Sequence, residues 1–371
     1  MASPKHNMLR EIFEQPEAVQ QTAEAASADV SSQSFYGVSW KEAGLASLDR
    51  ILIAASGTSR HAGIAGKFMI ESLAGIPVEV DYASEFQLSP AVVSPKTLTI
   101  VITQSGETAD TLAALRKAKK SGSKVVTISN VEQSSMMKEA DFRIHTKAGP
   151  ELAVPSTKAF TAQLTALFCF ALFLGEIRKK VALEHAAAFR SELASLPAKL
   201  QTVLGLDAKC EALARRFRDR SGFIFAARGV HNAVAMDGAL KLKEVSYLHS
   251  EAFPSGEILH GPLATIDEDI AVIAIATVDG ADSDSKARFE KTLSNLKELK
   301  GRSGKIIALA SEGDTRVGKL AEETLYLPKA PDLLLPILEI VPLQLFAYHI
   351  AILLGRNVDS PRSLAKAVVN D

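Results

Sequence analysis

The stretch TLTIVITQSGETADTLAALRKAKKSG, residues 97–122, predicts a strand, a polar turn and a helix in direct succession. Its first residues are β-branched and apolar, which is typical of a buried strand. Leu112, Leu115 and Ala118 then recur at helical spacing, and Gly122 is a helix-ending signal. The turn QSGET combines short hydroxyl side chains with a glycine, where backbone N–H groups and the helix dipole favour an anion. The turn fits either a phosphate-binding site or an ordinary capped helix start.

Similar strand patterns flank this stretch on both sides. ILIAA, residues 51–55, ends in Ser-Gly-Thr-Ser and precedes a helix pattern with small residues on one face. The alternation of strands and helices predicts a parallel sheet covered by helices on both faces. Ligands of such sheets gather at the carboxyl ends of the strands, where residues 56–59, 103–108 and 129–130 lie. The other strand patterns are residues 78–86, which include a helix start, 123–130 and 142–149.

The second half of the chain repeats the first. FIFAARGVHNAVAMDGALKLKEVSYL, residues 223–248, aligns with residues 51–75, and later strand patterns at 269–276 and 304–311 also have counterparts in the first half. Two copies of one α/β unit explain this repetition. The second copy has Arg-Gly-Val-His where the first has Ser-Gly-Thr-Ser, and it has no counterpart of QSGET. Only the first copy therefore keeps the candidate phosphate site.

The patterns divide the chain into five expected segments. A helical run over residues 158–220 joins the two copies, and short polar or helical segments stand at both chain ends. The expected segments are a helical extension (1–48), a first α/β domain (49–178), a helical connection (179–220), a second α/β domain (221–355) and a C-terminal tail (356–371).

Composition narrows the class of protein. The 371 residues are 47% hydrophobic and 23% charged, with a formal net charge of −1, so nothing indicates a nucleic-acid or anionic membrane partner. Cys169 and Cys210 form no paired motif, which argues against a disulfide framework or a cysteine metal site and fits a reducing cytoplasm. The polar, acidic N-terminus resembles neither a secretory signal nor a transit peptide. The apolar runs 164–174 and 333–354 are too short or too interrupted to span a membrane and predict buried helices.

Residues 240–262, LKLKEVSYLHSEAFPSGEILHGP, are rich in reactive groups. On a helix Lys241 and Glu244 share a face, so each can influence the ionisation of the other. A partly buried glutamate suits a general base beside a carbonyl, and the imidazole of His260 can shuttle protons near neutral pH. The alternative is a solvated Lys–Glu pair and a structural histidine. His231, His249 and His349 are expected to be structural.

The C-terminal sequence NVDSPRSLAKAVVND carries one further candidate. Asp359 to Arg362 suit a rigid entry to a last helix or turn, and Lys366 follows among apolar neighbours. A lysine with a partly desolvated ammonium can lose its proton and form a Schiff base with a carbonyl. The alternative is an ordinary surface lysine on a terminal tail.

Seven stretches together resemble the isomerase half of the glutamine:fructose-6-phosphate aminotransferases. They are SGTSRHAG, AGIPVEVDYASEF, TQSGETADTLAALRKAK, STKAFTAQL, GALKLKEVSYLHSEAF, HGPLATIDE and DSPRSLAKAV, in the order of the family, and they cover nearly the whole chain. The resemblance implies an α/β fold with two tandem sugar isomerase (SIS) domains. Each is a flavodoxin-like sheet between two helical layers, and the first domain binds the phosphosugar.

The resemblance also implies a role for each candidate residue. Glu244 would move a proton between C1 and C2, Lys366 would form the imine with the open-chain ketose, and Lys241 would support the proton relay. His260 would open the sugar ring from the neighbouring subunit of a homodimer. The implied reaction needs no metal and no organic cofactor. The implied substrate-binding residues are Thr58, Ser59, Thr103, Gln104, Ser105, Thr108, Val154, Ser156 and Ala365.

The sequence departs from the family pattern at several positions. Ser56 replaces a common cysteine and Thr103 a common serine, both with a polar hydroxyl kept, whereas Pro155 and Leu259 replace a small residue and a lysine. The family's amidotransferase half, with its N-terminal cysteine, has no counterpart, so we expect free ammonia to replace glutamine. The alternatives are glucosamine-6-phosphate deamination and, in a different class, a non-catalytic sugar-phosphate sensor, although a sensor would not need Glu244, His260 and Lys366.

Overall fold

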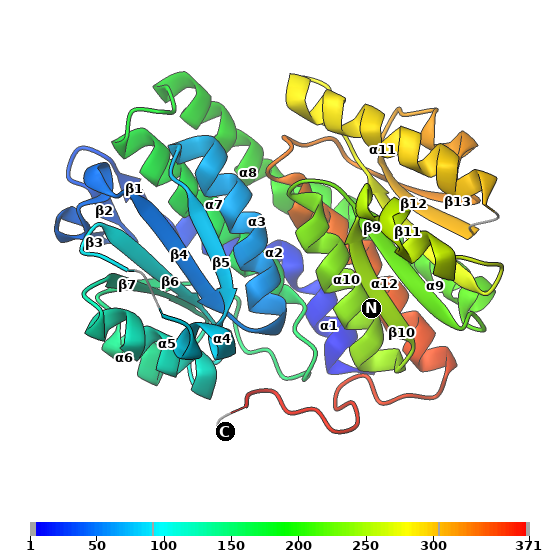
Figure 1. The fold of residues 1–371 in the computed structure, drawn as a ribbon, viewed down its shortest axis with the longest axis horizontal. Helices are drawn as coiled ribbons and strands as arrows, with labels where there is room; N and C mark the ends of the chain where they lie inside the picture. Colours follow the sequence, from blue (N-terminus) through cyan, green and yellow to red (C-terminus); the bar gives the residue numbers. More distant parts are fainter. Residues whose placement is uncertain (1–4, 91–92, 303–304, 369–371) are drawn as a thin grey trace. The chain divides into compact units, whose positions relative to one another are not determined.

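The computed structural model describes residues 5–90, 93–302 and 305–368, and this part of the chain contains two five-stranded parallel sheets (Figure 1). In each sheet, the strand that comes second in the sequence of that sheet lies at the edge, next to the strand that comes first. The third, fourth and fifth strands follow in order on the opposite side of the first strand. The strands of the first sheet, in spatial order, are β5 (Val78–Tyr82), β4 (Arg50–Ala55), β6 (Thr97–Ile102), β7 (Lys124–Ser129) and β8 (Phe142–His145). Those of the second are β10 (His249–Pro254), β9 (Gly222–Ala227), β11 (Ile270–Ala276), β12 (Lys305–Ser311) and β13 (Glu323–Leu327).

The identical strand orders confirm the predicted fold class and the internal repeat. This flavodoxin-like order reverses direction between the first and third strands of each copy, and ligands of open α/β sheets bind at such a reversal, outside the carboxyl ends of the strands. In the first sheet the reversal lies between β4 and β6, which pair directly from Arg50 to Ala55. The turns after these two strands are the two that carry the predicted phosphate-binding hydroxyls.

Contacts divide the chain into two compact units, named here after their central strands. The tail from Ala365 belongs to the unit that contains β4, although it is far from that unit in sequence. The β4 unit comprises Glu14–Glu151, Lys158–Ser195 and Ala365–Asp371, and the β9 unit comprises Met1–Phe13, Leu152–Thr157 and Leu196–Leu364.

Helices cover both faces of the β4 sheet because its side chains alternate between two apolar faces. Leu52 and Val101 pack in one cluster with residues of α4, α5 and α6. Ile53 faces α3, where a Cβ atom on Gly63 would collide with the Ile53 side chain, so the glycine permits close packing. The helices of this unit are α2 (Gln15–Ala25), α3 (Gly57–Ala74), α4 (Ala83–Leu88), α5 (Ala109–Lys120), α6 (Ser135–Glu139) and α7 (Lys158–Ile177), which packs on α3.

The β9 sheet is covered in the same way. Val272 of β11 belongs to a buried cluster with Phe289 of α11. On α10, a Cβ atom on Gly238 would collide with Leu343 of α12. The helices are α1 (Asn7–Phe13), α9 (Asp207–Phe217), α10 (His231–Ser246), α11 (Ser283–Gly301) and α12 (Leu335–Leu353), and α8 (Leu183–Leu204) contributes residues to both units.

The N-terminal extension differs in part from the sequence expectation, and the tail adopts the turn that the sequence left open beside a last helix. The segment expected to be helical over residues 1–48 is helical only as far as Ala25, and it continues as a small antiparallel sheet and two short 3-10 helices. The described tail, residues 356–368, contains turns and no helix. Residues 1–4 and 369–371 of the two expected end segments lie outside the described residues. The added elements are β1 (Ala28–Asp29), β2 (Ser34–Phe35), β3 (Val38–Ser39), η1 (Lys41–Ala43) and η2 (Leu45–Ser47).

Among the described residues two helices, α7 and α12, are long and apolar enough to cross a membrane, but 94% and 89% of their apolar windows are buried inside the protein. The prediction of buried helices is confirmed. Helix α7 extends beyond the apolar run 164–174 at both ends, and the polar residues Thr161 and Gln163 before the run are also buried in it. Helix α12 continues through Pro342, which the sequence pattern treated as an interruption.

Candidate active site

The turn after β6 is folded around the hydroxyl group of Thr103. The Thr103 hydroxyl accepts a hydrogen bond from the backbone N–H of Gly106 at 3.1 Å and lies 3.4 Å from the hydroxyl of Thr108. The Glu107 N–H donates to the Ser105 hydroxyl at 3.2 Å. Gln104, Ser105 and Thr108 are half-buried, so they remain accessible beside the N-terminus of α5, whereas Thr103 is buried. The geometry suits Thr103 to shaping the turn and the other three to contacting a ligand.

The turn after β4 offers a second set of hydroxyls at the same edge. Gly57, with a φ of 52°, adopts a left-handed conformation and starts α3 directly after the strand. Thr58 and Ser59 follow in its first turn and are half-buried. Ser59 Oγ accepts a hydrogen bond from Gln163 Nε2 of α7 at 3.0 Å. Because β4 and β6 are paired neighbours, these hydroxyls and those of the β6 turn lie at one edge of one sheet.

Gly106 is the position in the β6 turn that tolerates a side chain least. Its φ is 73°, and a Cβ atom there would collide with the side chain of Ser134. We expect Gly106→Ala to cost about 1–3 kcal/mol of folding stability and to weaken the binding of inorganic phosphate at the β6 turn, because the turn must shift. Gly122→Ala is the matched control: its φ is 88°, but no atom lies within 4 Å of the added Cβ. Equal melting temperatures and equal phosphate dissociation constants for the two variants would contradict a specific role of the β6 turn.

The C-terminal tail brings Lys366 into the β4 unit. The backbone carbonyl of Val368 accepts a hydrogen bond from the N–H of Ala109 at 3.0 Å, directly after Thr108 of the β6 turn. Lys366 Nζ donates to Glu151 Oε2 at 2.6 Å, and its side chain is 25% exposed. Ala365 is exposed. The structure therefore gathers Lys366 and the hydroxyl-bearing turns within one compact unit, and Lys366 is not an ordinary surface lysine.

In the β9 unit Lys241 and Glu244 form the contact that their spacing predicts. On α10, Lys241 Nζ donates to Glu244 Oε2 at 2.5 Å. The Lys241 side chain is 1% exposed and that of Glu244 is 21% exposed. The pair is thus an accessible carboxylate backed by a buried ammonium, and not the solvated pair of the alternative reading. Such a carboxylate can accept a proton from a bound molecule.

His260 and the 152–157 loop also lie in the β9 unit. His260 is exposed at the end of η3 (Glu257–His260), before Gly261 with a φ of 138° and η4 (Pro262–Thr265). Val154 and Ser156 are half-buried, and the Val154 N–H donates to the carbonyl of Asp359 at 2.9 Å. The Asp359 carboxylate accepts the N–H groups of Asn7 and Met8 at 3.0 and 2.8 Å. Through these bonds Asp359 joins the start of the tail to the 152–157 loop and to the beginning of α1.

In the β9 unit, buried side chains of the protein lie after β9 and β11, the strands that correspond to β4 and β6. His231, at the start of α10, lies 2.7 Å from Glu339 through its Nδ1 atom, and the Thr277 hydroxyl donates to the same carboxylate oxygen. The His231 and Glu339 side chains are both 0% exposed. Burial alone would lower the pKa of His231, but the charge of Glu339 and the hydrogen bonds of Asp332 and Glu339 outweigh it and raise that pKa. His231 is therefore part of the core of the β9 unit, as expected of a structural histidine.

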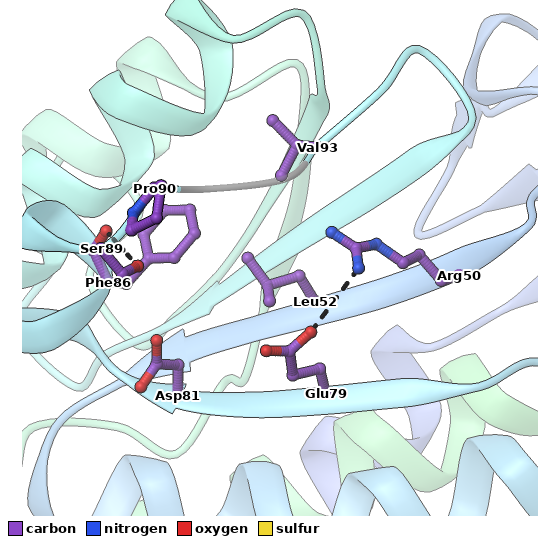
Figure 2. Close-up of a pocket in the computed structure, with 8 residues that line it drawn as sticks. All are labelled: Arg50, Leu52, Glu79, Asp81, Phe86, Ser89, Pro90 and Val93. Carbon is purple, nitrogen blue, oxygen red and sulfur yellow. Dashed lines mark hydrogen bonds and ion pairs between the residues drawn. The ribbon is translucent and has the colours of Figure 1, made fainter.

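A pocket of about 140 Å³ on the β4 unit is separate from these predicted residues (Figure 2). Arg50 and Glu79, from β4 and β5, form an ion pair of 3.7 Å in it, and Asp81 lies near them. None of the predicted site residues lines this pocket. Across residues 5–90, 93–302 and 305–368, no three His, Cys, Asp or Glu side chains gather into a group that could hold a metal ion.

Two residues that the sequence analysis missed now stand out. Glu151 contacts Lys366, and Gln163 contacts Ser59. Both contacts join residues more than a hundred positions apart, so neither helical spacing nor strand alternation could predict them. The sequence contains only a weak indication of these two residues. Gln163 is a polar residue within the very apolar segment that forms α7, and Glu151 is a charged residue shortly before it.

Comparison with known proteins places this arrangement in a family. The model of the family described as SIS domain matches residues 44–173 and 217–354, which contain the two parallel sheets. The chain belongs to the SIS domain family. One solved relative is described as the C-terminal domain of glucosamine-fructose-6-phosphate aminotransferase from Francisella tularensis. It is 39% identical with a TM-score of 0.89, and the match covers 96% of this chain and 99% of that one.

Curated relatives of this SIS-domain chain extend the likeness. It is 45% identical over 365 residues to the glutamine–fructose-6-phosphate aminotransferase [isomerizing] of Chlorobaculum tepidum, and the match covers 98% of this chain and 58% of that protein. The protein of the same name from Thermus thermophilus is 41% identical over 363 residues, again with 98% and 58% covered. The chain thus spans under two thirds of the length of these relatives. The resemblance to the isomerase half is confirmed.

Proposed function

We propose that the chain interconverts fructose 6-phosphate and glucosamine 6-phosphate by ketose–aldose isomerisation through a lysine imine. The observation that carries the proposal is the placement of Lys366 in the β4 unit, where Val368 is bonded to the first residue of α5. An amine beside a phosphate-binding edge suits a phosphorylated sugar with a reactive carbonyl. The names of the relatives from Chlorobaculum tepidum and Thermus thermophilus support this choice of substrate.

The proposed roles follow the chemistry of each group. The Lys366 amine attacks C2 of the open-chain ketose and forms an imine with loss of water. Ammonia then adds to C2 and displaces the Lys366 amine, and Glu244 moves a proton from C1 to C2 of the resulting imine. The buried ammonium of Lys241 supports Glu244 through their 2.5 Å contact. His260, which is exposed on η3, opens the sugar ring from the partner subunit of a homodimer. The proposed substrate contacts are Thr58, Ser59, Gln104, Ser105, Thr108, Val154, Ser156 and Ala365, and Thr103 contributes to substrate binding by shaping the β6 turn.

Free ammonia is the proposed nitrogen donor for the chemistry of these residues. Glutamine hydrolysis by a cysteine needs an accessible thiolate. Both cysteines are buried, and this burial raises the pKa of Cys169 and that of Cys210 to about 12. Neither thiol therefore suits that reaction. Two reduced, unpaired cysteines also support a cytoplasmic location for the proposed enzyme.

The proposal predicts turnover by the purified chain in both directions. With fructose 6-phosphate and ammonium it should produce glucosamine 6-phosphate, with a rate that rises with free ammonium. With glucosamine 6-phosphate alone it should release fructose 6-phosphate and ammonia, which tests the deaminase alternative in the same assay. Mass spectrometry would follow both sugars. Binding of the sugar phosphates without either reaction, and without exchange between fructose 6-phosphate and glucose 6-phosphate, would contradict the enzyme and favour a sensor.

A further inference from the structure

Glu151 is a buried carboxylate that accepts hydrogen bonds from both a side chain and the backbone. One oxygen accepts the Lys366 ammonium at 2.6 Å, and the other accepts the backbone N–H of Ala159 at 3.1 Å. The Glu151 side chain is 0% exposed. Ala159 lies in the first turn of α7, a helix of 20 residues, where the positive end of the helix dipole favours a carboxylate. The carboxylate is therefore fixed in direction, with one oxygen on the helix and the other on the amine.

The tail presents Lys366 to this carboxylate between two attachments. Two residues after Lys366, the Val368 carbonyl is bonded to Ala109 of α5, and three residues before it Ser363 turns the chain with a φ of 60°. Between these points the tail has no regular secondary structure. The hydrogen bond to Glu151 therefore helps to position Lys366 Nζ within a segment that has no regular secondary structure.

An ammonium group has no lone pair, so Lys366 needs a base before it can attack a carbonyl. We propose that Glu151 is this base, an inference that rests on the proposed function. The Glu151 carboxylate takes one proton from Nζ, and the neutral amine forms the C–N bond at the carbonyl carbon as the C=O π bond breaks. A second proton then passes from the nitrogen through water to the former carbonyl oxygen, which becomes a hydroxyl group. Glu151 then returns its proton to the departing hydroxyl group, which leaves as water. The protonated imine remains beside a carboxylate that is negatively charged again.

This role differs from that of a clamp that only holds the tail. A clamp would affect how well Lys366 is placed, and Gln could replace it as a hydrogen-bond partner. A base affects the rate of imine formation, and an amide cannot replace it because it accepts no proton at neutral pH. Glu151→Gln separates the two because it keeps the size of the side chain and an oxygen for the Ala159 N–H.

The experiment traps the imine. Protein is mixed with fructose 6-phosphate and cyanoborohydride, and the reduced adduct on Lys366 is timed by intact-protein mass spectrometry. We expect trapping in E151Q to be on the order of a hundredfold slower than in the wild type, as for loss of a general base. Dissociation constants for fructose 6-phosphate, from calorimetry, should stay within about threefold, because Glu151 holds no part of the phosphate site. Raising the pH should restore part of the rate, since hydroxide can then take the proton.

Glu71→Gln is the matched control. Glu71 also accepts a lysine Nζ, that of Lys67 at 2.6 Å, and a backbone N–H, that of Val78 at 2.9 Å, in the same unit. E71Q should trap the imine at the wild-type rate. If E151Q lacks a cooperative thermal transition, E151D takes its place, because its shorter carboxylate should still slow trapping at least about tenfold. Wild-type trapping by a folded Glu151 variant would overturn this inference alone, whereas no adduct in the wild type would overturn the proposed function itself.

Discussion

Lys366→Ala is expected to lower turnover by on the order of a thousandfold or more, in both directions of the proposed reaction, because no amine remains to form the imine. The dissociation constant for fructose 6-phosphate should change by less than about threefold, since the hydroxyls of the β4 and β6 turns are intact. Steady-state kinetics and calorimetry on the same preparation measure the two effects. The adduct with cyanoborohydride should disappear as well.

Lys67→Ala provides the comparison for this variant. Lys67, on α3, forms an ion pair of 2.6 Å with Glu71 in the β4 unit, just as Lys366 does with Glu151, but its side chain is 36% exposed. Loss of an exposed pair of this kind costs at most about 1 kcal/mol, so K67A should keep wild-type turnover. Comparable loss in the two variants would mean that removal of any lysine pair disturbs the unit, and turnover by K366A would remove the imine mechanism.

The fold could be predicted from the sequence because its signals are local. The QSGET turn lies between a β-branched strand and a helical pattern, and both elements form where the pattern places them, as β6 and α5. The repeat then predicted the second sheet from the first. Strand β10 was less visible, because His249 to Pro254 alternate weakly and pair only with the neighbouring strand β9. An edge strand of this kind depends on its partner more than on its own residues.

The candidate site could be predicted only in part. The spacing of Lys241 and Glu244 predicted their contact, because residues three apart share a helix face. The contact between Lys366 and Glu151 crosses most of the chain, and no pattern within either segment indicates it. The sequence left open whether the tail ends in a helix or a turn, for a related reason. Besides short turns of its own, the tail is held by contacts with Ala109 and Glu151, so helix propensity alone does not decide its conformation.

His231→Ala is expected to have the largest effect on stability. His231 and Glu339 are both 0% exposed and lie 2.7 Å apart, and Asp332 lies 3.4 Å from the other ring nitrogen. Removal of the imidazole leaves the Glu339 carboxylate buried without its cation, which should cost about 3–5 kcal/mol in the free energy of unfolding near pH 6. Calorimetric unfolding would measure the loss. His349→Ala is the matched control, because His349 also lies 2.7 Å from a carboxylate, that of Asp207, but the two side chains are 12% and 35% exposed.

The pH dependence of this stability distinguishes the charged pair from simple packing. The pKa of His231 is raised in the folded protein, so the folded state binds more protons than the unfolded state above the unfolded pKa of about 6.5. The stabilisation is therefore complete below about pH 6.5 and is lost as the pH rises through the raised value.

Several other groups with shifted pKa values titrate outside this pH window. The lowered pKa values of Asp332 and His145 act below it, and the cysteine thiols, whose pKa values are raised to about 12, act above pH 8.5. Between about pH 6.5 and 8.5 the unfolding temperature of the wild type should fall with a slope that H231A lacks and H349A retains. A slope that persists in H231A would assign the pH dependence to a different group, and a small loss at pH 6 would mean that the buried pair carries no net charge interaction.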